Sequence, residues 1–288
     1  MRVDSLLREA VRVLDVAGCE TPRVDAELIL AHVLRTTRSA VVAQGEARLD
    51  DRASQEVERL VSRRARREPL AYVLGEWGFR RLVLRVDRRV LVPRPETEVV
   101  VERCLARLSG QDRPRVLDVG TGSGAIALAI ADEHPGARVS ALDASAGALE
   151  VARENVARTR LAVELLHHDL FNGLPAGPWD LVVSNPPYVS PAELEGLEPE
   201  VREWEPREAL VAEGATEAVV RFALSVLRPG GALVLESAAN GAERVARLLG
   251  ELGYAEVRVS ADLAGRPRVV EGVVPAPGQP LGAEVSPP

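Results

Sequence analysis

The chain has 288 residues, of which 46% are hydrophobic and 27% charged, and its net charge is −7. These values are ordinary for a globular protein and exclude wholesale disorder or a collagen-like fold. No apolar run approaches the roughly 18 residues that a membrane span needs, and the charged N-terminus lacks a signal-peptide pattern, so we expect a cytoplasmic protein without membrane attachment.

The chain has only two cysteines and four histidines, so no metal site is expected. Charge is distributed unevenly: residues 1–92 hold 18 arginines against 14 acids, whereas residues 93–288 hold 18 against 29. Nucleic-acid phosphates require a basic surface. The acidic second part therefore argues against stable nucleic-acid binding. Separately, we expect the protein to be a monomer.

Residues 1–70 are predicted to form a helical substrate-recognition domain, because apolar residues recur at helical spacing between helix-start signals. The expected N-caps of its four helices, in chain order, are Asp4, Thr21, Ser39 and Asp50 or Asp51. Residues 71–92 are rich in β-formers such as Trp77 and Val86, which predicts a β-hairpin connector.

Helices and strands alternate over residues 93–275, which is typical of a parallel sheet with helices on both faces. The expected helices are 96–108, 123–133, 145–157, 215–228 and 240–252. The expected strands are 115–120, 137–142, 161–165, 180–184, 231–236, 254–260 and 267–274. A Pro- and Glu-rich loop is predicted over 185–207, and a disordered tail over 276–288.

A glycine-rich loop, D-V-G-T-G-S-G over 118–124, lies between a predicted strand and helix. Glycines let a ligand approach bare backbone, and the helix N-terminus offers unpaired N–H groups. Asp143 ends the next predicted strand, where a carboxylate can accept both ribose hydroxyls of an adenosine. Gly120, Gly122 and Ala125 also fit the dinucleotide pattern, so the loop alone leaves NAD and S-adenosylmethionine open.

Two details of this loop favour S-adenosylmethionine. Asp118 precedes the first glycine by two residues, where a carboxylate suits an amino-bearing ligand and repels a pyrophosphate. The further glycine at 124 completes D-x-G-x-G-x-G, the pattern of class I methyltransferases. The plainer interpretation is a glycine-rich turn that binds nothing.

Asn185-Pro186-Pro187-Tyr188 directly follows the predicted strand 180–184. Prolines have no N–H, so nearby carbonyls stay free to accept hydrogen bonds, and Asn185 offers both a donor and an acceptor. With Tyr188 as a flat wall, the segment could clamp a planar –NH₂ group. The plainer interpretation is a proline-rich turn.

Together these motifs resemble the HemK/PrmC-type methyltransferases, which modify the glutamine of the Gly-Gly-Gln motif in peptide chain release factors. The resemblance covers roughly residues 65–275. The matching stretches include EPLAYVLGE (68–76), VLVPRPETE (90–98), DVGTGSGAIALAIA (118–131), Asp169, SNPPYV (184–189), Glu205-Pro206, LRPGG with Glu236, and DLAG (262–265).

The resemblance implies an α/β, class I S-adenosylmethionine-dependent methyltransferase fold. It is Rossmann-like, with a mostly parallel seven-stranded sheet whose last strand is antiparallel, preceded by a helical bundle and a β-hairpin connector. The implied cofactor-binding residues are Gly120, Thr121, Gly122, Ser123, Gly124, Asp143, Asp169, Leu170 and Asn185.

The same resemblance implies that the methyl acceptor is a release factor glutamine amide. The implied catalytic residues are Asn185, Pro186 and Tyr188. The implied substrate-binding residues are Asn185, Pro186, Pro187, Tyr188, Phe79, Arg94, Glu96 and Thr97, the last four forming a roof with Pro95. Pro95 and Glu96 can also be explained as a helix start.

Three other functions stay open. An N-methyltransferase acting on an exocyclic amine of adenine or guanine would use the same clamp, although it needs a basic surface. An NAD-dependent oxidoreductase fits the glycine spacing but leaves the Asn-Pro-Pro-Tyr segment without a role. A non-catalytic module would need a defective site.

Two charged segments have no assigned role. The arginines at 59, 63, 64, 66 and 67 could neutralise a helix terminus or contact an acidic release factor. The acidic stretch 193–205 could be a lid or a solvated loop.

Overall fold

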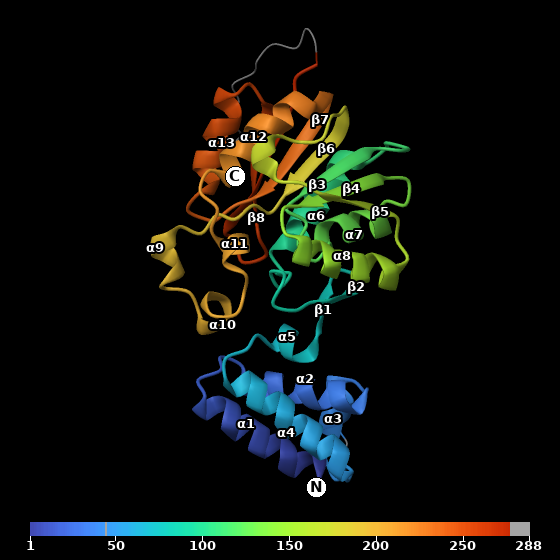
Figure 1. Cartoon of the computed structure of the whole chain (residues 1–288), viewed down its shortest axis with the longest axis vertical. Helices are drawn as coiled ribbons and strands as arrows, with labels where there is room; N and C mark the ends of the chain where they lie inside the picture. The colour runs from blue at the N-terminus through green and yellow to red at the C-terminus, as the bar shows by residue number, and fades with distance from the viewer. Residues whose placement is uncertain (44, 277–288) are drawn as a thin grey trace. The chain divides into compact units, whose positions relative to one another are not determined.

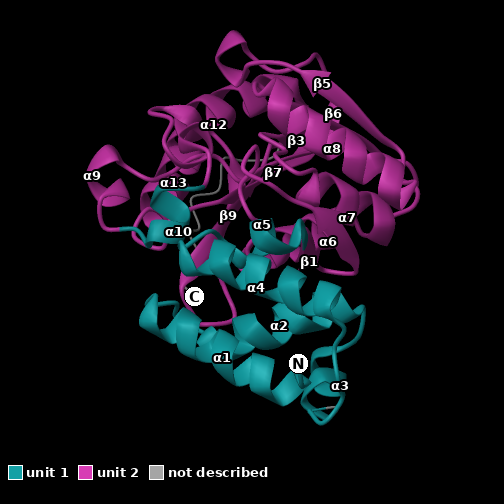
Figure 2. Cartoon of the chain, turned by 60° about the horizontal axis from the view of Figure 1, so that its bottom comes forward, with its two compact units in different colours: residues 1–76, 197–204 teal, residues 77–196, 205–288 magenta. Residues whose placement is uncertain are grey.

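The computed structural model describes residues 1–43 and 45–276. The chain divides into two compact units, which are coloured separately in Figure 2. Unit 1 comprises Met1–Glu76 together with Leu197–Trp204, and unit 2 comprises Trp77–Gly196 and the chain from Glu205 onward. The expectation of a disordered tail concerns residues that, apart from Ala276, lie outside the described ones.

Unit 1 is helical around its own apolar core. Its helices are α1 (Val3–Val16), α2 (Pro22–Leu34), α3 (Arg38–Ala43), α4 (Asp51–Ala65), α5 (Leu70–Leu74) and α10 (Pro199–Arg202). The core includes Leu14 of α1, Leu30 of α2 and Leu60 of α4, all essentially buried. The helical bundle that the sequence predicts ahead of the sheet is therefore present.

Two of the predicted N-caps of unit 1 are confirmed and two are wrong. Asp50 caps α4 by accepting from the Ala53 N–H at 2.7 Å, and Thr21 occupies the N-cap position of α2. Helix α1 begins before Asp4, because Val3 N and Asp4 N donate to the carbonyls of residues 47 and 45, which replace a side-chain cap. At α3 the capping hydroxyl is that of Thr37, since Ser39 already lies inside the helix.

A short hairpin, β1 (Glu76–Phe79) and β2 (Leu82–Arg85), begins at the boundary residue Glu76 and otherwise belongs to unit 2. The hairpin is shorter than the predicted segment 71–92. Helix α5 occupies the start of that segment, and residues 86–92 belong to no strand. Phe79 and Leu84 turn inward and join the core of unit 2.

The main sheet of unit 2 has seven strands in the order β5-β4-β3-β6-β7-β9-β8. Its strands are β3 (Arg115–Val119), β4 (Arg138–Asp143), β5 (Val163–His167), β6 (Trp179–Ser184), β7 (Leu227–Glu236), β8 (Ala255–Ala261) and β9 (Pro267–Val273). Pairing is parallel from β5 to β7, and β9 is antiparallel to both of its neighbours. The predicted fold class is confirmed.

Helices cover both faces of this sheet (Figure 1). One core packs α6 (Thr97–Leu108), α7 (Ala125–Glu133) and α8 (Ala146–Thr159) on one face, and another packs α12 (Ala215–Val226) and α13 (Ala242–Glu251) on the other. Strand β3 lies near the centre of the sheet, with β4 next to it on one side and β6 next to it on the other. The strand order therefore reverses direction at β3. This reversal is where open α/β sheets bind ligands, beyond the carboxyl ends of the strands.

The segment predicted as a loop over 185–207 contains helical turns instead. Helices α9 (Pro191–Leu194) and α10 begin with proline, and α11 (Arg207–Leu210) follows. Ser190 and Glu193 form a reciprocal capping box at α9. Proline and glutamate therefore act here as helix-start residues. Composition alone does not distinguish such helix starts from a proline- and glutamate-rich loop.

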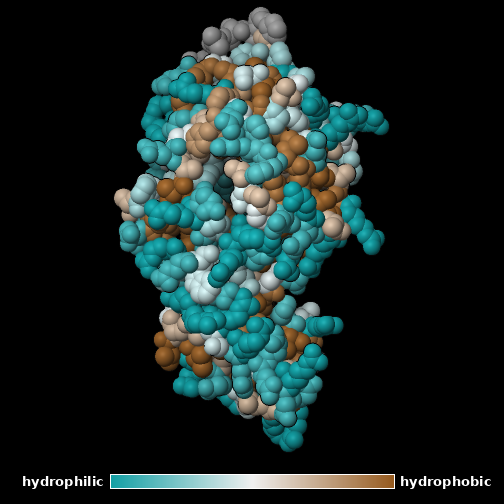
Figure 3. Space-filling model, in the orientation of Figure 1, coloured by the Kyte–Doolittle hydropathy of each residue, from teal (hydrophilic) through white to brown (hydrophobic). Residues whose placement is uncertain are grey.

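None of the helices in the described ranges is long and apolar enough to cross a membrane. The face drawn in Figure 3 is mainly hydrophilic, with hydrophobic residues in small separate groups.

Candidate active site

A cavity of about 330 Å³ opens in unit 2 at the carboxyl ends of β5, β4, β3 and β6. Its lining comes from residues 89–94 and Thr97, loop residues 120–123 with 125–126, residues 142–145 with Ala148, residues 168–171, Asn185, Pro187, and the 206–212 segment. Most of the predicted site residues therefore meet at one cavity.

The glycine loop adopts a backbone that only glycine takes readily. Gly120, Gly122 and Gly124 have φ angles of +74°, +55° and +83°. The N–H groups of Gly120 and Thr121 both donate to the Leu142 carbonyl at 2.9 Å, so the turn is fastened to the end of β4. Gly124 is the N-cap residue of α7 and does not line the cavity.

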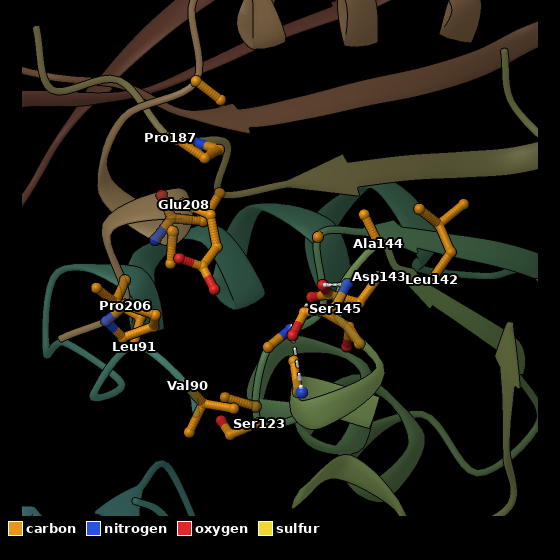
Figure 4. A pocket seen from close by; sticks show the side chains of 18 of the residues that line it. Val90, Leu91, Ser123, Leu142, Asp143, Ala144, Ser145, Pro187, Pro206 and Glu208 are labelled. Carbon is orange, nitrogen blue, oxygen red and sulfur yellow. Dashed lines mark hydrogen bonds between the residues drawn. The ribbon is translucent and has the colours of Figure 1, made fainter. Parts of the chain in front are cut away.

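Asp143 fixes the other side of this loop. Its carboxylate accepts from Gly122 N and Ser145 N, both at 2.9 Å (Figure 4). Burial raises the pKa of Asp143, and these two backbone hydrogen bonds oppose the rise. A carboxylate has about four acceptor positions. Asp143 therefore retains acceptor capacity in the cavity, and Figure 4 shows Glu208 pointing toward it from the opposite wall.

Asp118 does not face the cavity, contrary to the argument from its spacing. It is fully buried, and its Oδ2 accepts from the Thr121 hydroxyl at 2.7 Å. Its Oδ1 lacks a hydrogen-bond partner among the described residues, and burial raises its pKa to about 7. Asp118 therefore supports the glycine loop from inside the fold, because β3 runs through the centre of the sheet.

Asp169, Leu170 and Phe171 form another wall of the cavity. Asp169 caps the short helix η1 (Leu170–Asn172) by accepting from Phe171 N at 2.9 Å. The sequence analysis did not identify Phe171, yet this residue is 53% exposed and lines the cavity. An aromatic residue two positions after Asp169 was the available signal.

The Asn-Pro-Pro-Tyr segment presents its residues to different surroundings. Asn185 and Pro187 line the cavity, whereas Pro186 is buried. Asn185 Nδ2 donates to Thr97 Oγ1 at 3.4 Å. The Tyr188 hydroxyl donates to Glu236 at 3.3 Å, outside the cavity lining, and burial raises the pKa of Tyr188 to about 12.

Comparisons with known proteins agree with this geometry. A family model described as the PrmC N-terminal domain matches residues 5–75, and a methyltransferase small domain matches residues 97–197. The chain is 43% identical over 276 residues to a release factor glutamine methyltransferase of Deinococcus radiodurans, covering 94% of this chain and 98% of that protein. The chain belongs to the release factor glutamine methyltransferase family. A second member, from Caulobacter vibrioides, is 40% identical over 265 residues, covering 89% of this chain and 91% of that protein.

A solved structure adds a likeness in fold alone. The 16S rRNA N2 G1207 methyltransferase of T. thermophilus, in complex with AdoMet and guanosine, is 20% identical with a TM-score of 0.50. The likeness covers 69% of this chain and 49% of that one.

Arg94 forms an ion pair with Glu205, a residue of the matching stretches to which the sequence assigned no role. Arg94 Nη2 lies 2.6 Å from Glu205 Oε1, and the Glu205 side chain is only 1% exposed. Burial raises the pKa of Glu205, and Arg94 opposes the rise. Because Glu205 precedes the wall formed by Pro206 and Glu208, this ion pair holds that wall against the segment before α6.

Three residues of the expected roof, Phe79, Pro95 and Glu96, lie outside the cavity lining. Phe79 is 1% exposed in the core of unit 2. Glu96 occupies the N-cap position of α6 and accepts from Arg266 Nη2 at 2.9 Å. Among the residues that the structure describes, no group of three or more His, Cys, Asp or Glu is placed to hold a metal ion.

Proposed function

We propose that the protein transfers a methyl group from S-adenosylmethionine to the side-chain amide nitrogen (N5) of the glutamine in the Gly-Gly-Gln motif of peptide chain release factors. The observation that carries this proposal is the position of Asn185, an amide side chain at the same cavity as the glycine loop. An amide matches another amide, because each offers one acceptor and one donor group.

The chain's own residues fit S-adenosylmethionine. Bare backbone at Gly120 and Gly122 admits the methionine portion, and the free acceptor positions of Asp143 suit ribose hydroxyls. Leu170 and the exposed ring of Phe171 supply apolar contact for adenine. S-adenosylmethionine supplies a methyl group on a positively charged sulfur, which is electrophilic without a metal.

The protein's contribution to the reaction is alignment. An amide nitrogen is a weak nucleophile because its lone pair is delocalised over the carbonyl. Asn185 Oδ1 and the Pro186 carbonyl each accept one N–H of the substrate amide, which turns the nitrogen lone pair toward the methyl donor. Such positioning contributes up to about 7–11 kcal/mol. The proton lost from nitrogen passes to water, and no side chain is assigned as a base.

Intact mass spectrometry of a purified release factor, incubated with the protein and S-adenosylmethionine, tests the proposal. The expected result is a gain of one methyl group on the wild-type factor and none on a variant with Gln→Ala in the Gly-Gly-Gln motif. No gain on either factor, with S-adenosylmethionine binding demonstrated in parallel, contradicts it and redirects the assignment to an adenine or guanine amine.

A further inference from the structure

A buried carboxylate lies behind the Asn-Pro-Pro-Tyr segment and contacts it through two hydroxyl groups. Glu236, the last residue of β7, is 2% exposed. Its Oε2 accepts from Thr97 Oγ1 at 2.6 Å, and its Oε1 accepts from the Tyr188 hydroxyl at 3.3 Å. Thr97 in turn accepts from Asn185 Nδ2 at 3.4 Å. One side chain therefore supports both ends of the segment.

In each of these hydrogen bonds, the charge on Glu236 fixes which atom donates and which accepts. An ionised carboxylate only accepts, so the single proton of the Thr97 hydroxyl is committed to Glu236. The Thr97 oxygen can then only accept from Asn185, which turns the NH₂ group of that amide toward Thr97. The opposite atom, Asn185 Oδ1, is left to accept from a ligand in the cavity that Asn185 lines.

We propose that Glu236 is a positioning residue that orients the Asn185 amide through Thr97, so that Oδ1 faces the substrate N–H. This inference rests on the proposed function, because it concerns how the same clamp is held. A flipped Asn185 would present NH₂ to the substrate NH₂, and two donors cannot bond to each other.

The charge on Glu236 decides which group donates in each hydrogen bond between Glu236, Thr97 and Asn185. A protonated Glu236 could donate to Thr97, whose hydroxyl would then donate to Asn185 and favour the flipped amide. Burial raises the pKa of Glu236, while Thr97, Tyr188 and Arg268 oppose the rise and Glu96 adds to it. The clamp is therefore expected to lose its orientation as the pH falls through the raised pKa of Glu236.

Glu236→Gln is the decisive variant, because it keeps the shape but can donate as well as accept. We expect kcat to fall roughly 10- to 100-fold, the usual range for a lost hydrogen bond to a charged group, with S-adenosylmethionine affinity unchanged. Thr97→Val should reproduce the loss, and Thr97→Ser should retain activity because it keeps the hydroxyl. The contribution of Glu236 to the acidic limb of the kcat–pH profile should be missing in Glu236→Gln.

Glu271→Gln is the matched control, since Glu271 is another fully buried glutamate and accepts from Arg103 and Arg107. It should lower thermal stability without lowering kcat. A kcat of Glu236→Gln equal to wild type, an unaltered pH profile, or an equal loss in Glu271→Gln would each overturn the positioning role.

A second readout needs no release factor. In ¹H–¹⁵N spectra of the full chain, the side-chain NH₂ signals of Asn185 should shift as Glu236 titrates and should stop doing so in Glu236→Gln. Signals that titrate identically in both proteins would disprove the chain of hydrogen bonds. Because this measurement is independent of methyl transfer, it separates failure of the positioning role from failure of the proposed function.

Discussion

Arg64 and Glu200 form an ion pair with an Nη1–Oε1 distance of 2.8 Å, although α4 carries one and α10 the other. Both belong to unit 1. Arg64 also contacts Asp25 at 2.7 Å, and Arg67 binds Glu200 and Glu198. Two arginines of the basic cluster thus have their acidic partners within the same chain, in the stretch that follows Asn-Pro-Pro-Tyr.

Glu200→Ala is expected to destabilise unit 1. The Arg64 side chain is only 7% exposed, and loss of one partner of a buried ion pair costs about 3–5 kcal/mol. Since Asp25 still pairs with Arg64, we expect the lower end, about 3 kcal/mol, in urea unfolding. Glu46→Ala removes an exposed pair with Arg2 in the same unit and should cost less than about 1 kcal/mol. Equal effects of the two variants would contradict a structural role for Glu200.

Asn185→Ala is expected to lower the rate of methyl transfer strongly while S-adenosylmethionine still binds. The substitution removes the acceptor that orients the substrate amide, and loss of one oriented polar contact typically lowers kcat by about 10²–10³-fold. Single-turnover kinetics and calorimetry measure the two effects separately. Ser190→Ala, which alters the nearby N-cap of α9, is the control and should retain kcat. Normal turnover in Asn185→Ala would refute the clamp.

Gly122→Ala is expected to weaken cofactor binding through backbone strain alone. A Cβ at Gly122 would meet no atom within 4 Å, but its φ of +55° costs an L-residue about 1–2 kcal/mol. Since the proposed cofactor would contact this loop, the affinity for S-adenosylmethionine should fall by about 5- to 30-fold in titration calorimetry. Gly78→Ala also meets no atom and lacks a positive φ, so it should leave the affinity unchanged. A Gly122→Ala protein that binds like wild type would show that the loop conformation is not required.

Asp118→Asn is expected to make the protein more stable than wild type at pH 8. The folded pKa of Asp118, about 7, lies above its ordinary value of 3.8, so the folded state holds more protons than the unfolded state between these values. The contribution of Asp118 to the free energy of unfolding therefore falls as the pH rises through that window, by on the order of a few kcal/mol. Urea unfolding of both proteins at pH 4 and pH 8 measures this. A stability difference that is the same at both pH values would be inconsistent with a neutral Asp118 below pH 7.

The parts of the site that sequence reasoning located are those defined by local backbone chemistry. Among the cavity-lining residues, Gly120 and Gly122 free the backbone and Pro187 restricts it, so their pattern can be recognised in the sequence without knowing their partners. Asp118 shows the limit of such reasoning, because its spacing fitted a ligand contact although β3 buries it completely.

The missed contacts depend on residues far apart in the chain. Glu205 is 111 positions from Arg94, and Glu236 is 139 positions from Thr97. Each looks like an ordinary glutamate in sequence, because only the folded sheet brings its partner near. The one-turn helices around Pro191 and Pro199 were missed for a different reason, since they are too short to show helical periodicity.

The assignment of Leu197–Trp204 to unit 1 has a consequence for protein engineering. The polypeptide passes between the two units at residues 76–77, 196–197 and 204–205, so a single cut or fusion point cannot separate them. A catalytic fragment that starts at residue 77 would keep Glu198 and Glu200 but lose Arg64 and Arg67. Chimeras that exchange the first 76 residues between relatives must therefore exchange residues 197–204 as well. Recombinants joined at residue 76 alone should be less stable, because they mismatch the two segments of unit 1.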